Sequence, residues 1–535
     1  MKRTILVGAL VSLALLPAFA QDASSDFDSP AATTAADTGA AGAFSWGSLK
    51  YSGDQEFAWR FGAYDPADRT GGSMDSKMAA EYKLDGLKVV AAGQVKENEF
   101  VPGETAAFYT LGPVKFGVGY QEFSWGVADK KNPTDTLNAR DYRFSPNADR
   151  LVNPAASVAV YPADWVSLEA VYEPWKEQSK YPTDFAAGLR AGFAAQKSSM
   201  VATLGPNVTT LAGVSASGAA AVNAALSSYS VNVTTETSPV NTYNNPVYGG
   251  RANFFLPGVD LSFSYLYDRD TFYTPVVTMT STAVPLTVLT GQASQAGTTV
   301  NIYLPSKVDL VYKRIHRFGL DAKTTIDRYG LWVEAAYNKT EASSNDAYDN
   351  RHDNLDWTVG GDFNFGPGSA YYMNLQYAGT YVLGYDASTV KDYNNVTPTL
   401  TSLDYMTKAT YRSMTQMLGS QSEQLMNTLT GNIKFPLADA TVTPSFSGAV
   451  IVPYTYDDTT TTRIASAYLN PEVDWAPVDG VHVFFGAELA YGWVKNSGSS
   501  DVSLNTTTDK MGLYTTDNNV YLKVKYSWNG NLGAQ

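Results

Sequence analysis

Residues 481–494 read VHVFFGAELAYGWV and indicate the class of fold. From Val481 to Trp493 every second side chain is apolar, while the alternate positions hold His482, Glu488 and small or mixed residues. One apolar face at a period of two is typical of a β-strand. Three other stretches repeat the pattern at similar length: 259–268, 355–365 and 519–528.

The first 20 residues have the pattern of a secretory signal peptide. Lys2 and Arg3 precede an apolar run, and a small-x-small cleavage site ends at Ala20. We expect cleavage after Ala20 and export of the mature chain. Residues 21–45 are Ala, Thr, Asp, Ser and Gly with little to bury, so they are predicted to form a flexible tail.

Composition favours strands over spanning helices. The 535 residues include 35 Tyr, 23 Phe and 43 Gly, and no run of 18 apolar residues follows the signal. A membrane admits strands only as a closed barrel. The formal charge of −14 becomes about −16 when the two positive charges of the signal are removed, which argues against nucleic acid as a partner. The absence of Cys rules out a disulfide framework and lipid attachment through Cys.

Tight turns rich in Gly, Pro and Asp divide the chain into strand pairs. Eight such turns are expected, at 84–86, 111–113, 162–164, 256–258, 327–330, 366–368, 437–439 and 477–480.

Longer connections alternate with these turns and bring the strand count to 18. Short turns on one side and long loops on the other are typical of outer-membrane barrels, and both termini then fall on the short-turn side. The nine longer connections are expected at 65–75, 97–103, 126–154, 176–246, 269–305, 342–353, 381–423, 454–460 and 495–516.

We therefore predict an all-β fold, a transmembrane antiparallel up-and-down β-barrel over 46–528, followed by a C-terminal tail, 529–535. The best estimate is 18 strands within a range of 14 to 18, because Pro444 weakens the strand at 440–452. The expected location is the bacterial outer membrane, with its lipid as the surrounding partner. A soluble β-helix or exported solenoid is the alternative, since it would also be rich in strands.

Two of the long outer loops, 176–246 and 381–423, are expected to be partly helical. Residues 183–227 are rich in Ala, and 403–426 place Leu and Met at roughly helical spacing. Two interpretations stay open. The helices pack on one another above the barrel, or they form a lid or an apolar ligand funnel.

The densest mixture of charges lies in loop 126–154. The stretch WGVADKKNPTDTLNARDYRF, 125–144, resembles porin-like bacterial outer-membrane β-barrel proteins with a W-G-x-x-D-x-x-N-P-x-D-x-L-N-x-R-D signature. The resemblance covers about 50 residues and implies a porin-like barrel. Our leading hypothesis for its function is a passive channel for small hydrophilic solutes. The third loop of general diffusion porins folds into the lumen, and such channels are often trimers, so a homo-oligomer is implied by resemblance alone.

A barrel of 16 to 18 strands leaves an aqueous channel, and a loop with charges of both signs inside it would set size and charge preference. The alternatives are a solvated outer loop or a salt-bridged clamp against the inner wall. The candidate constriction residues are Asp129, Lys130, Lys131, Asp135, Arg140, Asp141, Arg143, Asp149 and Arg150. The candidate lumen-wall residues are Glu169, Glu173, Arg251, Asp260, Glu334, Asp356, Asp362, Glu488, Lys523 and Lys525.

Other functions have less support. A transporter of hydrophobic molecules, like the long-chain fatty-acid channels, would suit the Ala- and Met-rich loops and the sequence NPAA at 153–156. A surface adhesin would suit the long Thr-, Ser- and Tyr-rich loops. An enzyme is not expected, because the chain has three His and no nucleophile signature. No metal-ligand spacing or cofactor motif is present.

Overall fold

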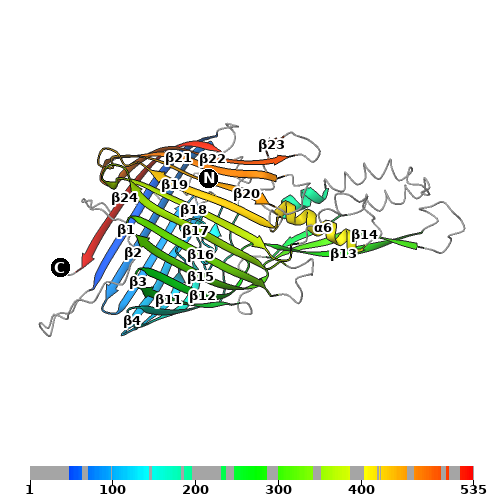
Figure 1. The fold of residues 1–535 in the computed structure, drawn as a ribbon, viewed down its shortest axis with the longest axis horizontal. Helices are drawn as coiled ribbons and strands as arrows, with labels where there is room; N and C mark the ends of the chain where they lie inside the picture. Colours follow the sequence, from blue (N-terminus) through cyan, green and yellow to red (C-terminus); the bar gives the residue numbers. More distant parts are fainter. Residues whose placement is uncertain are drawn as a thin grey trace, which may run out of the picture.

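Eighteen antiparallel strands, each hydrogen-bonded to the next, close into one barrel in the computed structural model of the chain (Figure 1). The predicted fold class and strand number are confirmed. The barrel strands are β1 (Ser48–Gly62), β2 (Gly71–Leu84), β3 (Leu87–Lys96), β4 (Glu99–Leu111), β5 (Val114–Gln121), β8 (Asn153–Ala163), β9 (Val166–Glu173), β11 (Val247–Leu256), β12 (Val259–Arg269), β15 (Arg314–Ile326), β16 (Tyr329–Thr340), β17 (Asn354–Phe365), β18 (Tyr371–Val382), β19 (Leu425–Lys434), β20 (Val442–Tyr454), β21 (Arg463–Val478), β22 (Val481–Lys495) and β24 (Asn519–Gly533).

The structure describes residues 47–533 with internal gaps. The predicted signal peptide, the tail at 21–45 and much of loops 176–246 and 381–423 lie outside the described residues. The gaps are 63–69, 98, 144–147, 182–185, 195–229, 237–245, 286–298, 342–350, 386–402, 419–420, 422, 455–462, 496–501 and 505–517.

The first and last strands close the barrel. β1 and β24 pair from Gly62 opposite Asn519 to Ser48 opposite Gly533. β24 therefore continues five residues past Trp528, and the predicted tail at 529–535 is wrong over residues 529–533. The reason is that the first residues of β1 need strand partners, and an open sheet edge would leave their backbone groups unpaired.

The eight predicted tight turns are confirmed. Each joins consecutive strands at the end of the barrel where β1 begins and β24 ends. Asp85 and Gly258 adopt positive φ values of 49° and 85°, which such turns require.

One predicted long connection, 97–103, is wrong. β3 ends at Lys96 and β4 begins at Glu99, so Pro102 and Gly103, which suggested a loop, lie within β4. The strand tolerates them because the β3–β4 register shifts between Ala91 and Gly93.

The faces of the barrel are inverted relative to a soluble protein. On β15 the outward side chains Phe318 and Leu320 are 49% and 43% exposed, while the inward Arg317 and Asp321 are 7% and 1% exposed. An apolar exterior around a polar interior is the arrangement of a barrel that spans the outer membrane. Among the described helices, none has the length and apolar character needed to cross a bilayer.

A small folded layer stands on the long-loop end of the barrel (Figure 1). It contains helix α6 (Leu403–Leu418), the helical residues 186–194, and a separate sheet in the order β10-β14-β13. The prediction missed this sheet, whose strands extend beyond the barrel inside stretches expected to be loops. The strands are β10 (Asn232–Thr235), β13 (Thr274–Pro285) and β14 (Thr299–Val311).

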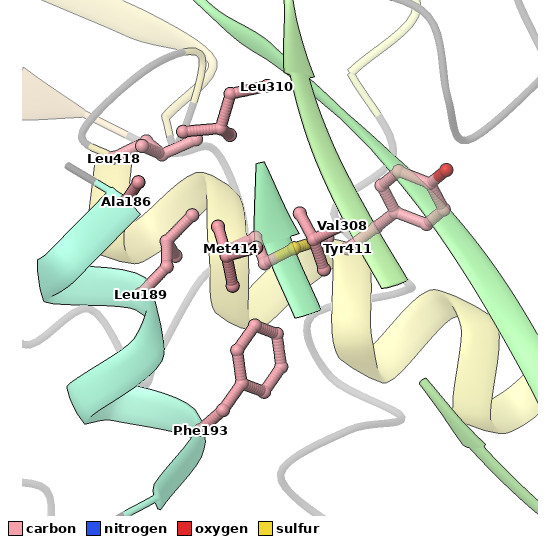
Figure 2. Packing of buried hydrophobic residues seen from close by; sticks show 9 residues of the cluster. Ala186, Leu189, Phe193, Val308, Leu310, Tyr411, Met414 and Leu418 are labelled. Carbon is pink, nitrogen blue, oxygen red and sulfur yellow. The ribbon is translucent and has the colours of Figure 1, made fainter. Parts of the chain in front are cut away.

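Apolar side chains hold this layer together (Figure 2). Met414 of α6 is fully buried among Leu189, Phe193 and Val308, and the Tyr411 hydroxyl accepts a 2.8 Å hydrogen bond from the backbone N–H of Val277. The predicted helix at 403–426 is confirmed over 403–418. Its Met and Leu side chains pack against the other helix and the sheet.

Candidate functional site: the loop inside the barrel

The segment between β5 and β8, residues 122–152, crosses the interior of the barrel. We call it the inner loop. It leaves the wall at β5 and bonds to inward-facing side chains of four strands, β15 to β18, through Arg317, Glu334, Thr358 and Asn374. Glu334, Thr358 and Asn374 lie well inside their strands, so the inner loop meets the wall at mid-height.

Glu334 forms the central anchor of the inner loop. Its Oε1 accepts hydrogen bonds from the backbone N–H groups of Val127 and Ala128, the latter at 2.6 Å. Its Oε2 accepts a 3.3 Å bond from the hydroxyl of Thr134. The carboxylate is fully buried, and charge-assisted bonds of this kind offset the loss of its water.

Gly126 permits this approach. Its φ of 92° lies in the left-handed region, and a Cβ at this position would lie 2.6 Å from Oε1 of Glu334. Any larger residue would strain the backbone and push the carboxylate away. The Gly of the Trp-Gly pair in the signature is therefore required on steric grounds.

Further bonds fix the part of the inner loop that faces β17 and β18. The hydroxyl of Thr358 donates to the carbonyl of Lys131 at 2.7 Å, and the ammonium of Lys131 donates to Thr380 at 2.9 Å. Asn132 folds the chain locally, because its Oδ1 accepts a 3.0 Å bond from the backbone of Asp135. This side-chain bond to the backbone makes a compact Asx-type turn.

Arg317 completes the anchoring from β15. Its guanidinium donates to the carbonyl of Pro133 at 3.0 Å, although the side chain is only 7% exposed.

Paired charges hold the base of the inner loop. Asp135, with a side chain 1% exposed, meets Arg140 at 2.7 Å and Arg150 at 2.5 Å. Asp141 and Arg143 pair at 2.8 Å. These ion pairs join residues of the inner loop to each other, and we call them the clamp.

The clamp also reaches the neighbouring strands. Arg143 meets Glu99 at 2.7 Å, and Asp149 meets Lys96 at 2.6 Å. Burial opposes ionisation of Asp141, but the hydrogen bonds and charge of Arg143 outweigh it and hold the pKa of Asp141 below its usual range.

Asp129 and Lys130 stand apart from the clamp. Both are exposed at the far side of the inner loop. Asp129 accepts a hydrogen bond from Asn374, and Lys130 forms no ion pair within 4.0 Å among the described residues. We call these two residues the tip.

The ten predicted wall residues divide into two groups. Among the described contacts, Glu334 and Glu169 are the two that bond to the inner loop, the latter through the indole N–H of Trp125 at 3.1 Å. The others lie elsewhere on the strands: Glu173 is fully buried, Arg251 meets Asp321 at 3.2 Å, Asp356 accepts from Thr380 at 2.5 Å, Asp362 accepts from Tyr372 at 3.1 Å, Glu488 accepts from Asn519 at 3.1 Å, Lys523 lies 4.2 Å above the ring of Tyr521, Lys525 meets Asp54 at 3.4 Å, and Asp260 is exposed.

Several residues at this site were not predicted. Thr358, Asn374 and Thr380 are neutral, and they were missed because charge was the criterion. Their alternation with apolar residues was the available signal. The buried pair of Lys176 and Asp268, at 2.5 Å, also escaped prediction. Lys176 donates to the carbonyl of Thr136 at 2.6 Å and so holds the inner loop too.

Fold and site together define a transmembrane β-barrel of the outer-membrane type with a loop anchored inside it. No family model matches the chain, and no curated protein matches it. The solved structure of Pseudomonas aeruginosa OccK3 (OpdO) is similar at 11% identity and a TM-score of 0.44, covering 91% of this chain and 96% of that one.

Two more solved structures are similar over comparable lengths. Acinetobacter baumannii OccAB4 matches at 9% identity and a TM-score of 0.41, over 90% of this chain and 98% of that one. A loop-deletion mutant of OmpT, an outer membrane protein of Vibrio cholerae, matches at 11% identity and a TM-score of 0.34, over 90% and 99%. The TM-scores of these superpositions are low. The assignment of a barrel therefore rests on the strand pairing of this chain itself.

Proposed function

We propose that this protein is an outer-membrane channel that passes small hydrophilic solutes by passive diffusion, and that the inner loop forms its narrowest part. The observation that carries the proposal is the set of bonds from Glu334 to Val127, Ala128 and Thr134. They hold the inner loop against β16, six strands along the wall from β5, where the loop begins.

The shape of the barrel supports a channel. Eighteen strands enclose more space than wall side chains can fill. The inward positions of the barrel carry charged and amide side chains that favour water. The inner loop then occupies part of the cross-section, which restricts passage to small solutes.

In this proposal the inner loop is both held in place by ion pairs and the narrowest part of the channel. The ion pairs of Asp135 and Asp141 fix the base of the inner loop, and the tip presents Asp129 and Lys130 to the open interior. Neighbouring charges of opposite sign give a local field, so the tip is proposed to tune the preference between ions.

The residues that favoured a transporter of hydrophobic molecules have packing and hydrogen-bonding roles in this fold. Met406, Met414 and Leu418 are buried in the packed outer layer. Asn153 begins β8, where its buried side chain accepts a 2.9 Å bond from the backbone of Glu177.

Planar-bilayer recordings test the proposal. The full chain and a variant lacking 129–150 are compared, together with the milder double variant Thr358→Val and Thr380→Val, which keeps the loop length. Both variants are expected to conduct more than the full chain. Equal conductance in all three would place the narrowest part elsewhere. Liposome swelling by sugars is the second measurement, and binding of fatty acids without sugar entry would favour the hydrophobic alternative.

A further inference from the structure

A cluster of aromatic and basic side chains lies on the outer surface of the barrel at its long-loop end. Its members share one sheet face across four neighbouring strands. They point outward, since Phe318 and Leu320 continue the same face of β15 toward the bilayer centre and are 49% and 43% exposed. The cluster consists of Tyr248, Tyr265, Tyr267, Arg314, His316 and Lys339.

Contacts within the cluster fix its geometry. The guanidinium carbon of Arg314 lies 4.8 Å from the ring centre of Tyr267. The rings of Tyr267 and His316 are 4.9 Å apart, and the Tyr265 hydroxyl lies 3.0 Å from Nδ1 of His316. Lys339 is the direct strand partner of His316. Arg314 lies two residues before His316 on β15, so Arg314 and Lys339 share the same sheet face on neighbouring strands.

Arg314 and Lys339 lack an acidic partner within ion-pair distance among the described residues, unlike several arginines inside the barrel. Those arginines are Arg140, Arg150 and Arg251, each within 4.0 Å of a carboxylate. The guanidinium of Arg314 is oriented by one 2.7 Å bond to the carbonyl of Pro246.

Glu341 is an acidic residue next to this cluster. It accepts a 2.7 Å hydrogen bond from the hydroxyl of Tyr267. Glu341 also acts on Arg314 electrostatically, but it forms no ion pair within 4.0 Å with Arg314 or Lys339 among the described residues.

The position of the cluster along the barrel axis, at the long-loop end, favours a lipid headgroup as its partner. Tyr side chains gather at the level of lipid headgroups, and long loops mark the outer side of an outer-membrane barrel. Arg forms forked hydrogen bonds with phosphate, and Lys adds a point charge. Basic pockets on barrel or helix surfaces at this level suit anionic headgroups.

We propose that this surface binds the phosphate-bearing headgroup of an outer-leaflet lipid, with Arg314 and Lys339 on the phosphate and acyl chains over Phe318 and Leu320. The proposal rests on the membrane-spanning barrel and is independent of what the channel passes.

Native mass spectrometry of the full chain in detergent tests it, with bisphosphorylated lipid A as the probe and dephosphorylated lipid A as the comparison. The double variant R314Q/K339Q is expected to weaken binding of the phosphorylated probe by about tenfold or more, since each basic residue contributes to anionic lipid affinity. The variant R314K should retain most of the binding.

Arg328 provides a matched control. It stacks on Tyr329 at 5.3 Å in the turn at the opposite rim of β15 and β16, so R328Q removes a similar pair from the other leaflet. R328Q should leave binding unchanged. Equal binding of both lipid probes, or equal loss in R328Q and the double variant, overturns the proposal. Full competition by millimolar inorganic phosphate would show a free-anion site in place of a lipid site.

Discussion

The carboxylate of Glu334 lies 2.6 Å from the backbone nitrogen of Ala128, a residue 206 positions earlier in the chain. The bond joins the inner loop to β16, six strands along the wall from β5, where the loop begins. This buried side chain is thus the central one of several contacts that set where the inner loop lies in the cross-section. Weakening this contact should free the inner loop from the wall.

Replacing Glu334 by Gln should raise single-channel conductance and current noise. The amide retains the shape but loses the charge that strengthens three hydrogen bonds, each on the order of 1.5–3 kcal/mol when the acceptor is ionised. Planar-bilayer recording measures the effect. Asp362→Asn is the control, because Asp362 bonds to Tyr372 of the wall. Unchanged conductance in Glu334→Gln would contradict the anchoring role.

The tip charges should act in opposite directions on ion preference. Lys130→Gln should move the reversal potential in a salt gradient toward cation preference, and Asp129→Asn toward anion preference. Both shifts should shrink at high salt, because the Debye length falls to about 3 Å at 1 M. Lys307→Gln makes the same charge change in the outer layer and should have no effect. Parallel shifts in the two tip variants would count against a field at the tip.

Acid should loosen the clamp only below about pH 4. The pKa of Asp141 lies below its usual range despite burial, because Arg143 binds the ionised form. The unfolded carboxyl titrates near about 3.9, so the stabilisation is complete above that pH and is lost as pH falls through the lower folded pKa. The contribution of Asp141 to conductance should therefore appear only as pH falls below about 4.

The variant Asp141→Asn is the partner experiment for this pH series. It should conduct more at neutral pH and show a smaller acid step, since the titrating contact is gone. A step between about pH 5 and 7 in the unmodified protein would require another group.

Removing residues 529–535 should weaken the closed barrel. Residues 529–533 pair with Ser48–Ser52, so the truncation strips one side of the β1 ladder at a cost on the order of a few kcal/mol. Thermal unfolding in detergent, followed by the shift between folded and unfolded bands on a gel, measures the loss. Removing only 534–535 is the control. A truncated chain as stable as the control would show that the last pairs are dispensable.

Much of the barrel could be predicted because its signals are local. The tight turns are marked by Gly, Pro and Asp, and alternation such as that of 481–494 identifies both faces of a strand. The predicted strand boundaries were wrong where pairing with a neighbouring strand decides whether a residue is in a strand or a loop. Pro102 and Gly103 look like a loop, yet the shifted β3–β4 register absorbs them. Trp528 looks like the last residue of a strand, yet Ser48–Ser52 extend pairing to Gly533.

The inner loop could likewise be predicted only in part. Its composition predicted a folded, charged loop, and the structure places six of the nine candidate constriction charges in ion pairs, most of them within the loop itself. Sequence could not show that Asp135 faces two Arg residues, because both contacts depend on how the chain turns back at 140–150. The sequence also could not single out Thr358 or Asn374 among the many neutral wall residues, because their role depends on where the inner loop meets the wall.

The pairing of β1 with β24, which we call the seam, also determines which step of folding comes last. Gly533 must be synthesised and brought to Ser48 before the cylinder can close, so this pairing has the largest sequence separation in the sheet. Hairpins between neighbouring strands can form early at small entropic cost, whereas the seam must wait for the end of the chain. Until then two bare strand edges remain open to pairing with other chains.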